Sequence, residues 1–214
     1  MATILFGGYK GGTGKSTLAT NYAVYLARAG RDVLLVDTDK QGSADGWAAM
    51  RGAEAELPRV HCVQKFADVA GAVRDLVGRY DEIVIDAGGR DSRELRSAML
   101  VANALYVPLK ASQFDLWTMD QVDQMVNDAR GFNPELEAWA VVSMAPTNPQ
   151  IRETAEAREL LAEFGNVRLM SATICERKAY REATATGRGV LELNNTKAAA
   201  ELEAFGEEVA RGLQ

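Results

Sequence analysis

The densest set of residues suited to chemistry lies in the segment GGYKGGTGKST, residues 7–17. It follows an apolar run and opens a segment of helical period, which is the context of a phosphate-binding loop. Its glycines permit backbone conformations that turn successive N–H groups inward around phosphate oxygens. Lys15 would add a positive charge at the β- and γ-phosphates, and the Ser16 hydroxyl would bind Mg²⁺. The segment therefore predicts a site for a nucleoside triphosphate with Mg²⁺.

Two residues depart from the common form of such a loop. Tyr9 stands where the pattern G-x-x-x-x-G-K-[ST] has its first glycine, and Lys10 adds a second lysine. At the outer edge of the loop, Lys10 is poorly placed for its own γ-phosphate but can offer charge to a second nucleotide; the alternative is a solvated surface lysine. The residues expected to bind the nucleotide are Lys10, Gly11, Gly12, Thr13, Gly14, Lys15, Ser16 and Thr17.

A pair of carboxylates, Asp37 and Asp39, follows the next apolar run along the chain. Because the carboxyl ends of parallel strands meet at one edge of a sheet, we expect both side chains beside the phosphate loop. There they can hold Mg²⁺ through water or orient an attacking water in line with the γ-phosphate. Each aspartate taken alone is also compatible with an ordinary strand-end cap. The pair at this location favours a role in phosphate chemistry.

The elements that must position these residues alternate between short apolar runs and longer segments of helical period, which is typical of strand–helix units. The expected strands are 3–7, 32–36, 60–63, 82–86, 104–109, 138–144 and 167–170. The expected helices are 15–29, 66–77, 92–101, 118–129, 148–164 and 198–212. The fold class is α/β: a mainly parallel twisted sheet of about seven or eight strands with helices on both faces. We expect one domain over residues 1–214.

Composition excludes several other classes of protein. The 214 residues are 47% hydrophobic and 25% charged, which suits a globular domain with a full core. A formal net charge of −6 argues against a protein that coats nucleic acid with its whole surface, but a local basic patch stays possible. Two cysteines 113 residues apart support neither a disulfide framework nor a CxxC motif. No apolar run approaches the roughly 18 residues of a membrane span, so we expect a cytoplasmic protein.

From the loop onward, the sequence resembles the deviant Walker A ATPases of the ParA/MinD family. Three segments carry the likeness: KGGTGKST in the loop, DTDKQ after the second strand, with a lysine where a proline is usual, and IVIDAGG at a Walker B strand. A fourth segment, residues 107–116, looks like a dimer-facing loop of that family. The likeness spans residues 4–209 and is strongest at the phosphate loop.

The resemblance implies a homodimer that holds ATP and Mg²⁺ between its subunits and hydrolyses the ATP to ADP and phosphate, slowly without a partner. Lys15 would act on its own nucleotide, Lys10 would reach the nucleotide of the partner, and Asp39 would be the hydrolytic residue. The residues implied at the metal are Ser16, directly, and Asp37, Asp39 and Asp86 through water.

Residues 174–190 resemble the small ParF-type partition ATPases, which bind DNA without regard to sequence. The early position of the phosphate loop leaves no room for the N-terminal helix-turn-helix extension of longer ParA proteins. The expected DNA-binding residues are Arg177, Lys178, Arg181 and Arg188. A solvated helix of mixed charge is the alternative, and Arg177 is also a candidate for the nucleotide site.

The function implied by this resemblance is the positioning of a cargo. ATP dimers would bind nucleoid DNA, and a ParB-like or other adaptor protein would stimulate hydrolysis and release them; the cargo would be a plasmid, a chromosomal locus or a protein cluster. The final helix is rich in glutamate and would be repelled by anionic lipid, so no membrane partner is expected. The alternatives are a metabolic P-loop enzyme related to dethiobiotin synthetase, against which Lys10 argues, and an inactive nucleotide-binding scaffold.

Overall fold

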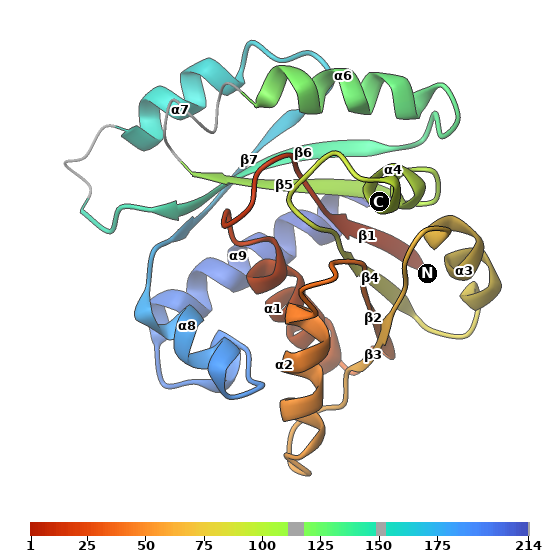
Figure 1. Cartoon of the computed structure of the whole chain (residues 1–214). Helices are drawn as coiled ribbons and strands as arrows, with labels where there is room; N and C mark the ends of the chain where they lie inside the picture. The colour runs from red at the N-terminus through yellow and green to blue at the C-terminus, as the bar shows by residue number, and fades with distance from the viewer. Residues whose placement is uncertain (111–117, 149–152, 214) are drawn as a thin grey trace.

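A parallel sheet forms the centre of the protein in the computed structural model, which describes residues 1–110, 118–148 and 153–213. Its strands are β1 (Ala2–Phe6), β2 (Val33–Asp37), β3 (His61–Gln64), β4 (Glu82–Asp86), β5 (Ala104–Lys110), β6 (Glu137–Ala145) and β7 (Arg168–Cys175). They lie in the order β3-β2-β4-β1-β5-β6-β7, and each pairing is parallel (Figure 1). The strand order changes direction at β1, and ligands of open α/β sheets bind at the carboxyl ends of the strands near such a point.

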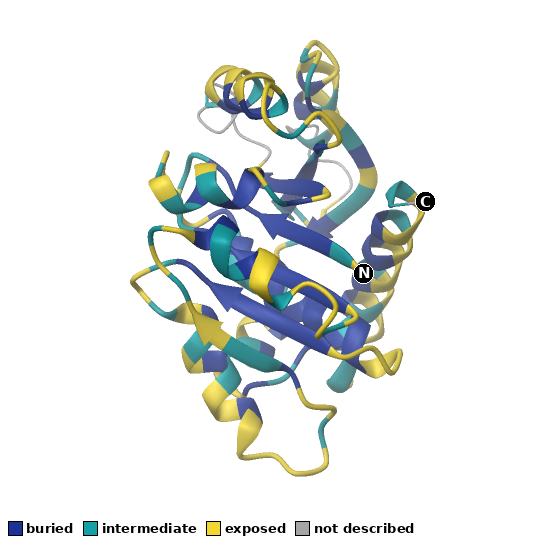
Figure 2. Cartoon of the chain, turned by 90° about the vertical axis from the view of Figure 1, so that its right-hand side faces the viewer, coloured by how far each residue is buried: buried dark blue, intermediate teal, exposed yellow. Residues whose placement is uncertain are grey.

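Helices cover both faces of this sheet (Figure 1). One face carries α1 (Lys15–Arg28), α2 (Ser43–Gly52), α8 (Lys178–Ala185) and α9 (Thr196–Gly212), together with a 3-10 turn, η1 (Val190–Glu192). The other face carries α3 (Val69–Leu76), α4 (Arg93–Met99), α6 (Met119–Arg130) and α7 (Glu153–Leu161). Figure 2 shows the central strands buried between helices whose outer faces are exposed, whereas the edge strand β3 is partly exposed. Within the described ranges, no helix is long and apolar enough to cross a membrane.

The observed elements confirm the expected α/β class and the place of every expected strand. Only β7 is much longer than the expected strand 167–170. The expectation ended where the apolar run stops, at Met170, but the backbone continues to pair with β6 as far as Cys175. The apolar pattern does not predict α2, whose sequence SADGWAAMRG is dominated by alanine and glycine, or the highly charged α8. The helix expected at 148–164 is present as α7, and its residues 149–152 lie outside the described ranges.

A buried ion pair attaches α2 to the C-terminal part of the chain. Arg51 and Glu192 are 2% and 4% exposed and share two hydrogen bonds of 2.7 and 2.8 Å. The same guanidinium donates to the carbonyl oxygens of Pro58 and Gly187. Both charges are therefore hydrogen-bonded in a site that excludes water, which is the condition under which a buried ion pair is tolerated.

Breaking this pair on one side should destabilise the protein. Arg51→Met leaves Glu192 buried without its partner and should lower the free energy of unfolding by about 3–5 kcal/mol. Arg168→Met is the matched control, since Arg168 pairs with Glu137 but is 64% exposed, and its loss should cost less than about 1 kcal/mol. Equilibrium unfolding in urea measures both variants. Similar small losses would show that the buried pair is unimportant for stability.

Candidate active site

The carboxyl ends of three neighbouring strands bring the predicted site residues together. Parallel register pairs Asp86 at the end of β4 with Phe6 at the end of β1 and with Asp37 at the end of β2. The predicted phosphate loop follows Phe6 directly, so both aspartates lie beside it. Thr38 continues from β2 and donates from its N–H and its hydroxyl to the Asp86 carbonyl oxygen, at 2.9 and 3.0 Å.

The phosphate loop is an open cradle at the start of α1. Gly12 and Gly14 have φ of +73° and +94°, a region that favours glycine. A Cβ built on Gly11, Gly12 or Gly14 would have no neighbouring atom within 4 Å, so the space on the side-chain side of these residues is open. None of the described side chains caps α1, and its first turn carries no acidic residue. Its first N–H groups are thus available to an anion, as in phosphate sites at helix N-termini.

Lys15 lies within this cradle rather than in solvent. Its side chain is 6% exposed, and Nζ donates to the Lys10 carbonyl oxygen at 2.8 Å. Burial lowers the pKa of the ammonium group, and the nearby Asp86 and Asp39 carboxylates oppose that shift. The lysine therefore bridges the two ends of the loop and faces the acidic end of β4.

Asp86 is fully buried, and neither of its carboxylate oxygens accepts a hydrogen bond from a described residue. Burial raises its pKa to about 7, and the Asp37 and Asp39 charges add to this. Ser16 and Lys15 oppose the shift, although the Ser16 hydroxyl lies outside good hydrogen-bond geometry. Buried carboxylates without partners are rare and call for a ligand or ion. Asp86 and Ser16 thus fit a hydrated Mg²⁺.

Direct coordination by the protein alone does not fit this site. Among the described residues, no three His, Cys, Asp or Glu side chains gather closely enough to hold a metal. A cation here would need oxygens from water and from phosphate, which is how Mg²⁺ is usually held next to nucleotides.

Asp37 mainly organises the backbone. Its Oδ1 accepts from the Asp39 N–H at 2.9 Å, and its Oδ2 accepts from the N–H groups of Ala44 and Asp45 at 3.0 and 2.9 Å. Burial raises its pKa, whereas these hydrogen bonds oppose the shift. Asp37 therefore holds the first turn of α2 and shapes the segment that carries Asp39. The magnesium role expected for Asp37 stays a prediction.

Two glycines after β4 bring a third segment into the site. A Cβ on Gly89 would lie 2.6 Å from the backbone of Gly11, and one on Gly88 would lie 3.2 Å from Asp39 Oδ2. At residue 89 only glycine allows this close approach of two backbones, whereas a Cβ at residue 88 would require the Asp39 side chain to move slightly. The segment after Asp86 therefore lies against both the phosphate loop and Asp39.

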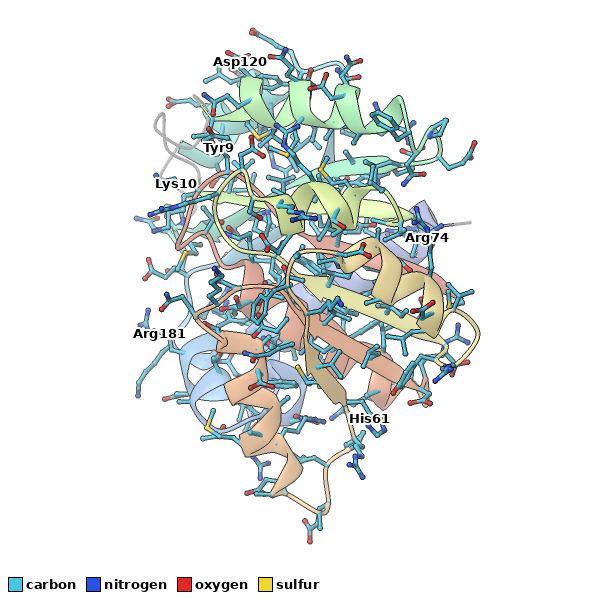
Figure 3. All side chains as sticks on the ribbon, turned by 45° about the vertical axis from the view of Figure 1, so that its right-hand side comes forward. Tyr9, Lys10, His61, Arg74, Asp120 and Arg181 are labelled. Carbon is cyan, nitrogen blue, oxygen red and sulfur yellow. The ribbon has the colours of Figure 1, made fainter. Side chains whose placement is uncertain are left out.

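The predicted basic residues lie around α8, next to a pocket of about 340 Å³ that reaches Gly14 and Thr17. Arg177 lines this pocket and is held by Glu201, with Nε 2.9 Å from Oε1. Its place in this pocket is compatible with its alternative assignment to the nucleotide site, which stays a prediction. Each of the other three is paired with a glutamate and is more exposed: Lys178 80%, Arg181 67% and Arg188 35%. Figure 3 shows Lys10 and Arg181 along the same side of the molecule.

Two buried residues that the motifs did not indicate support the loop. Ser143, on β6, donates to the Thr13 carbonyl oxygen, and Asn21, on α1, donates to Thr17 O and accepts from the Val190 N–H. Neither belongs to a sequence pattern with a known mechanism, and their partners lie up to 169 residues away along the chain. Of the expected dimer-facing segment, residues 111–116 lie outside the described ranges.

Burial of Asp86 should make the free energy of unfolding depend on pH. In protein free of nucleotide and Mg²⁺, folded Asp86 stays protonated up to about pH 7, whereas the unfolded residue ionises near pH 4. Asp86→Asn should therefore gain stability relative to wild type as pH rises from about 4 to about 7, by up to about 4 kcal/mol, with no further gain above. Unfolding series across this range measure the difference. A difference that does not change with pH would contradict the buried, ionisable Asp86.

Comparison with known proteins places this geometry in a family. A model of the CobQ/CobB/MinD/ParA nucleotide binding domain matches residues 4–190. Maintenance of carboxysome distribution protein A from Halothiobacillus neapolitanus is 29% identical over 197 residues, covering 89% of this chain and 87% of that protein. Chromosome-partitioning ATPase Soj from Thermus thermophilus is 33% identical over 185 residues, covering 73% and 74%.

A solved structure of apo McdA from Cyanothece has a similar fold, with a TM-score of 0.80 at 15% identity, covering 98% of this chain and 99% of that one. The sheet order, the phosphate loop and the sequence matches agree with each other. The chain belongs to the ParA/MinD family of P-loop ATPases.

Proposed function

We propose that this chain is an ATPase of the ParA type that dimerises on Mg²⁺ and ATP, binds DNA nonspecifically and positions a cargo with an adaptor protein. The observation that carries the proposal is the buried Asp86 carboxylate, which accepts no hydrogen bond from a described residue and lies close to Lys15 of the open phosphate loop. Such a site is incomplete without phosphate and a cation. The contact of Gly89 with the loop supports a switch that responds to what the loop holds.

The residues would divide the chemistry between them. The N–H groups of residues 11–17 and the Lys15 ammonium bind the phosphates and neutralise their charge. Ser16 and Asp86 would hold Mg²⁺, which would offset the charge that develops on the transferred phosphoryl group. Asp39 orients the attacking water, because its carboxylate is partly exposed beside Gly88 at the mouth of the site. Lys10 supplies charge to the nucleotide of a second subunit.

The proposal that the protein moves a cargo with an adaptor protein is based on its relatives and not on the geometry of the phosphate site. The similar proteins are named for carboxysome distribution and for chromosome partitioning, so the names of this chain's relatives point to more than one cargo. We propose that this chain likewise uses an adaptor that stimulates a slow hydrolysis, and that its ATP state associates with the nucleoid.

The surface proposed for DNA consists of Lys178, Arg181 and Arg188 around α8. Lys178 and Arg181 are exposed and Arg188 is half-buried, and their glutamate partners can be exchanged for phosphates at low cost, because ion pairs open to solvent contribute little. DNA binding through such contacts is dominated by release of counterions and falls steeply with salt. Arg177 contributes less, since Glu201 holds it beside the pocket.

Removal of the hydrolytic carboxylate should separate binding from turnover. Asp39→Ala should lose at least about 100-fold in the rate of phosphate release, yet sediment as a dimer with Mg²⁺ and ATP, because the phosphate-binding groups remain. Asp81→Ala is the control: Asp39 accepts a hydrogen bond from the Gln41 N–H, and Asp81 likewise accepts one from the Asp32 N–H, but Asp81 is exposed and lies at the amino ends of the strands. Wild-type turnover in Asp39→Ala would remove Asp39 from the mechanism. A monomer in ATP would favour the metabolic enzyme.

Loss of charge on α8 should weaken DNA binding. Lys178→Ala with Arg181→Ala removes two contacts and should reduce the slope of log affinity against log salt by about 2, while ATP-dependent dimerisation persists. The control pair, Arg31→Ala with Arg168→Ala, removes the same charge from ion-paired residues that are 48% and 64% exposed, but these residues lie at the amino ends of β2 and β7. Fluorescence anisotropy with random-sequence duplex DNA measures both pairs. Equal effects would place the DNA on another surface.

A further inference from the structure

A hydroxyl group at the end of β6 contacts the phosphate loop from within the core. Ser143 is 1% exposed, and its Oγ donates to the Thr13 carbonyl oxygen at 2.6 Å. The Leu109 carbonyl oxygen on β5 lies 3.2 Å from the same Oγ. A serine hydroxyl has one proton, so the shorter contact with Thr13 is the stronger of the two.

The backbone of β6 is irregular at this residue. Its register with β7 shifts between Val142 and Ala145, and Met144 has a φ of +50°. A side-chain-bearing residue in this left-handed region is strained and persists only where its surroundings fix it. Irregularities of this kind re-aim side chains next to functional sites. Here the irregularity surrounds the one residue of β6 whose side chain bonds to the phosphate loop among the described contacts.

The bond to Thr13 determines where the next N–H group points. Thr13 O and the Gly14 N–H belong to one peptide unit, which is trans, so the two groups point in opposite directions. Because Thr13 O is directed toward β6, the Gly14 N–H is directed away from β6. Gly14 is the N-cap of α1, and the space beside its Cα is unfilled. Its N–H is therefore well placed to be a donor of the cradle.

We infer that Ser143 is a positioning residue for the nucleotide, because it fixes the Thr13–Gly14 peptide in the orientation that presents the Gly14 N–H to a phosphate oxygen. The inference rests on the proposed function, since it requires a nucleotide in this loop. Ser143 acts through the backbone of Thr13. Without its hydroxyl, the Thr13 carbonyl would lose its buried donor, and the peptide would be free to rotate.

Affinity for ADP with Mg²⁺ tests this role without requiring dimerisation or hydrolysis. Ser143→Ala should weaken the binding about tenfold, whereas Ser143→Thr, which keeps the hydroxyl, should bind within about twofold of wild type. Ser97→Ala is the matched control: the Ser97 hydroxyl accepts from the Ala70 N–H at 3.0 Å, between α3 and α4. The Ser97→Ala variant should lose a similar amount of free energy of unfolding but bind ADP with the affinity of the wild type. If Ser143→Ala does not fold, Ser143→Cys replaces it, since a thiol is a weak donor.

A second readout reports on the peptide itself. In protein labelled with ¹⁵N-glycine, Mg²⁺ and ADP should shift the Gly14 amide resonance downfield in wild type and Ser143→Thr, and by less than half as much in Ser143→Ala. Wild-type affinity and shift in Ser143→Ala would overturn the positioning role while leaving the proposed function intact. Failure of the wild-type protein to bind ADP at all would overturn both.

Discussion

A buried carboxylate without a hydrogen-bond partner is the constraint on which the site depends. Asp86 ends a central strand, where an ionised carboxylate costs several kcal/mol unless it is paired. The chain places Lys15 and Ser16 near it but leaves both of its oxygens unsatisfied by described residues. The phosphate-loop glycines Gly11, Gly12 and Gly14 leave open the positions that a side chain would fill. The protein thus tolerates an unstable local arrangement that phosphate and a cation would complete.

The same edge of the sheet connects the site with distant parts of the chain. Asp37 holds the first turn of α2, and Arg51 at the end of α2 binds Glu192 and the Gly187 carbonyl oxygen. The segment that contains Gly187 directly follows α8, the helix proposed to meet DNA. A continuous set of contacts therefore runs from the phosphate site to α8, which suits an ATPase whose DNA contacts depend on its nucleotide.

Much of the fold and the phosphate loop could be predicted from the sequence, because local signals carry them. Apolar runs buried on two faces located the strands, and GKST after a strand located the cradle. Apolar periodicity and motifs did not predict the parts of the structure that depend on contacts between distant residues. The helix α2 has little apolar period and depends on Asp37 and Arg51 for its position, and Ser143 reaches Thr13 across 130 residues. The sequence showed that residues 177–188 are rich in basic side chains. It did not show that each of them pairs with a glutamate, namely Glu201, Glu182, Glu176 and Glu54.

Calorimetric titration of ATP into the protein, with and without Mg²⁺, tests the central claim most directly. If Asp86 and the cradle form an incomplete site for a cation and phosphate, Mg²⁺ should strengthen ATP binding by at least about tenfold, and each Mg²⁺-dependent binding event should release protons near pH 7 as the Asp86 carboxyl ionises. Equal affinity with and without Mg²⁺, or the absence of ATP binding, would contradict the account.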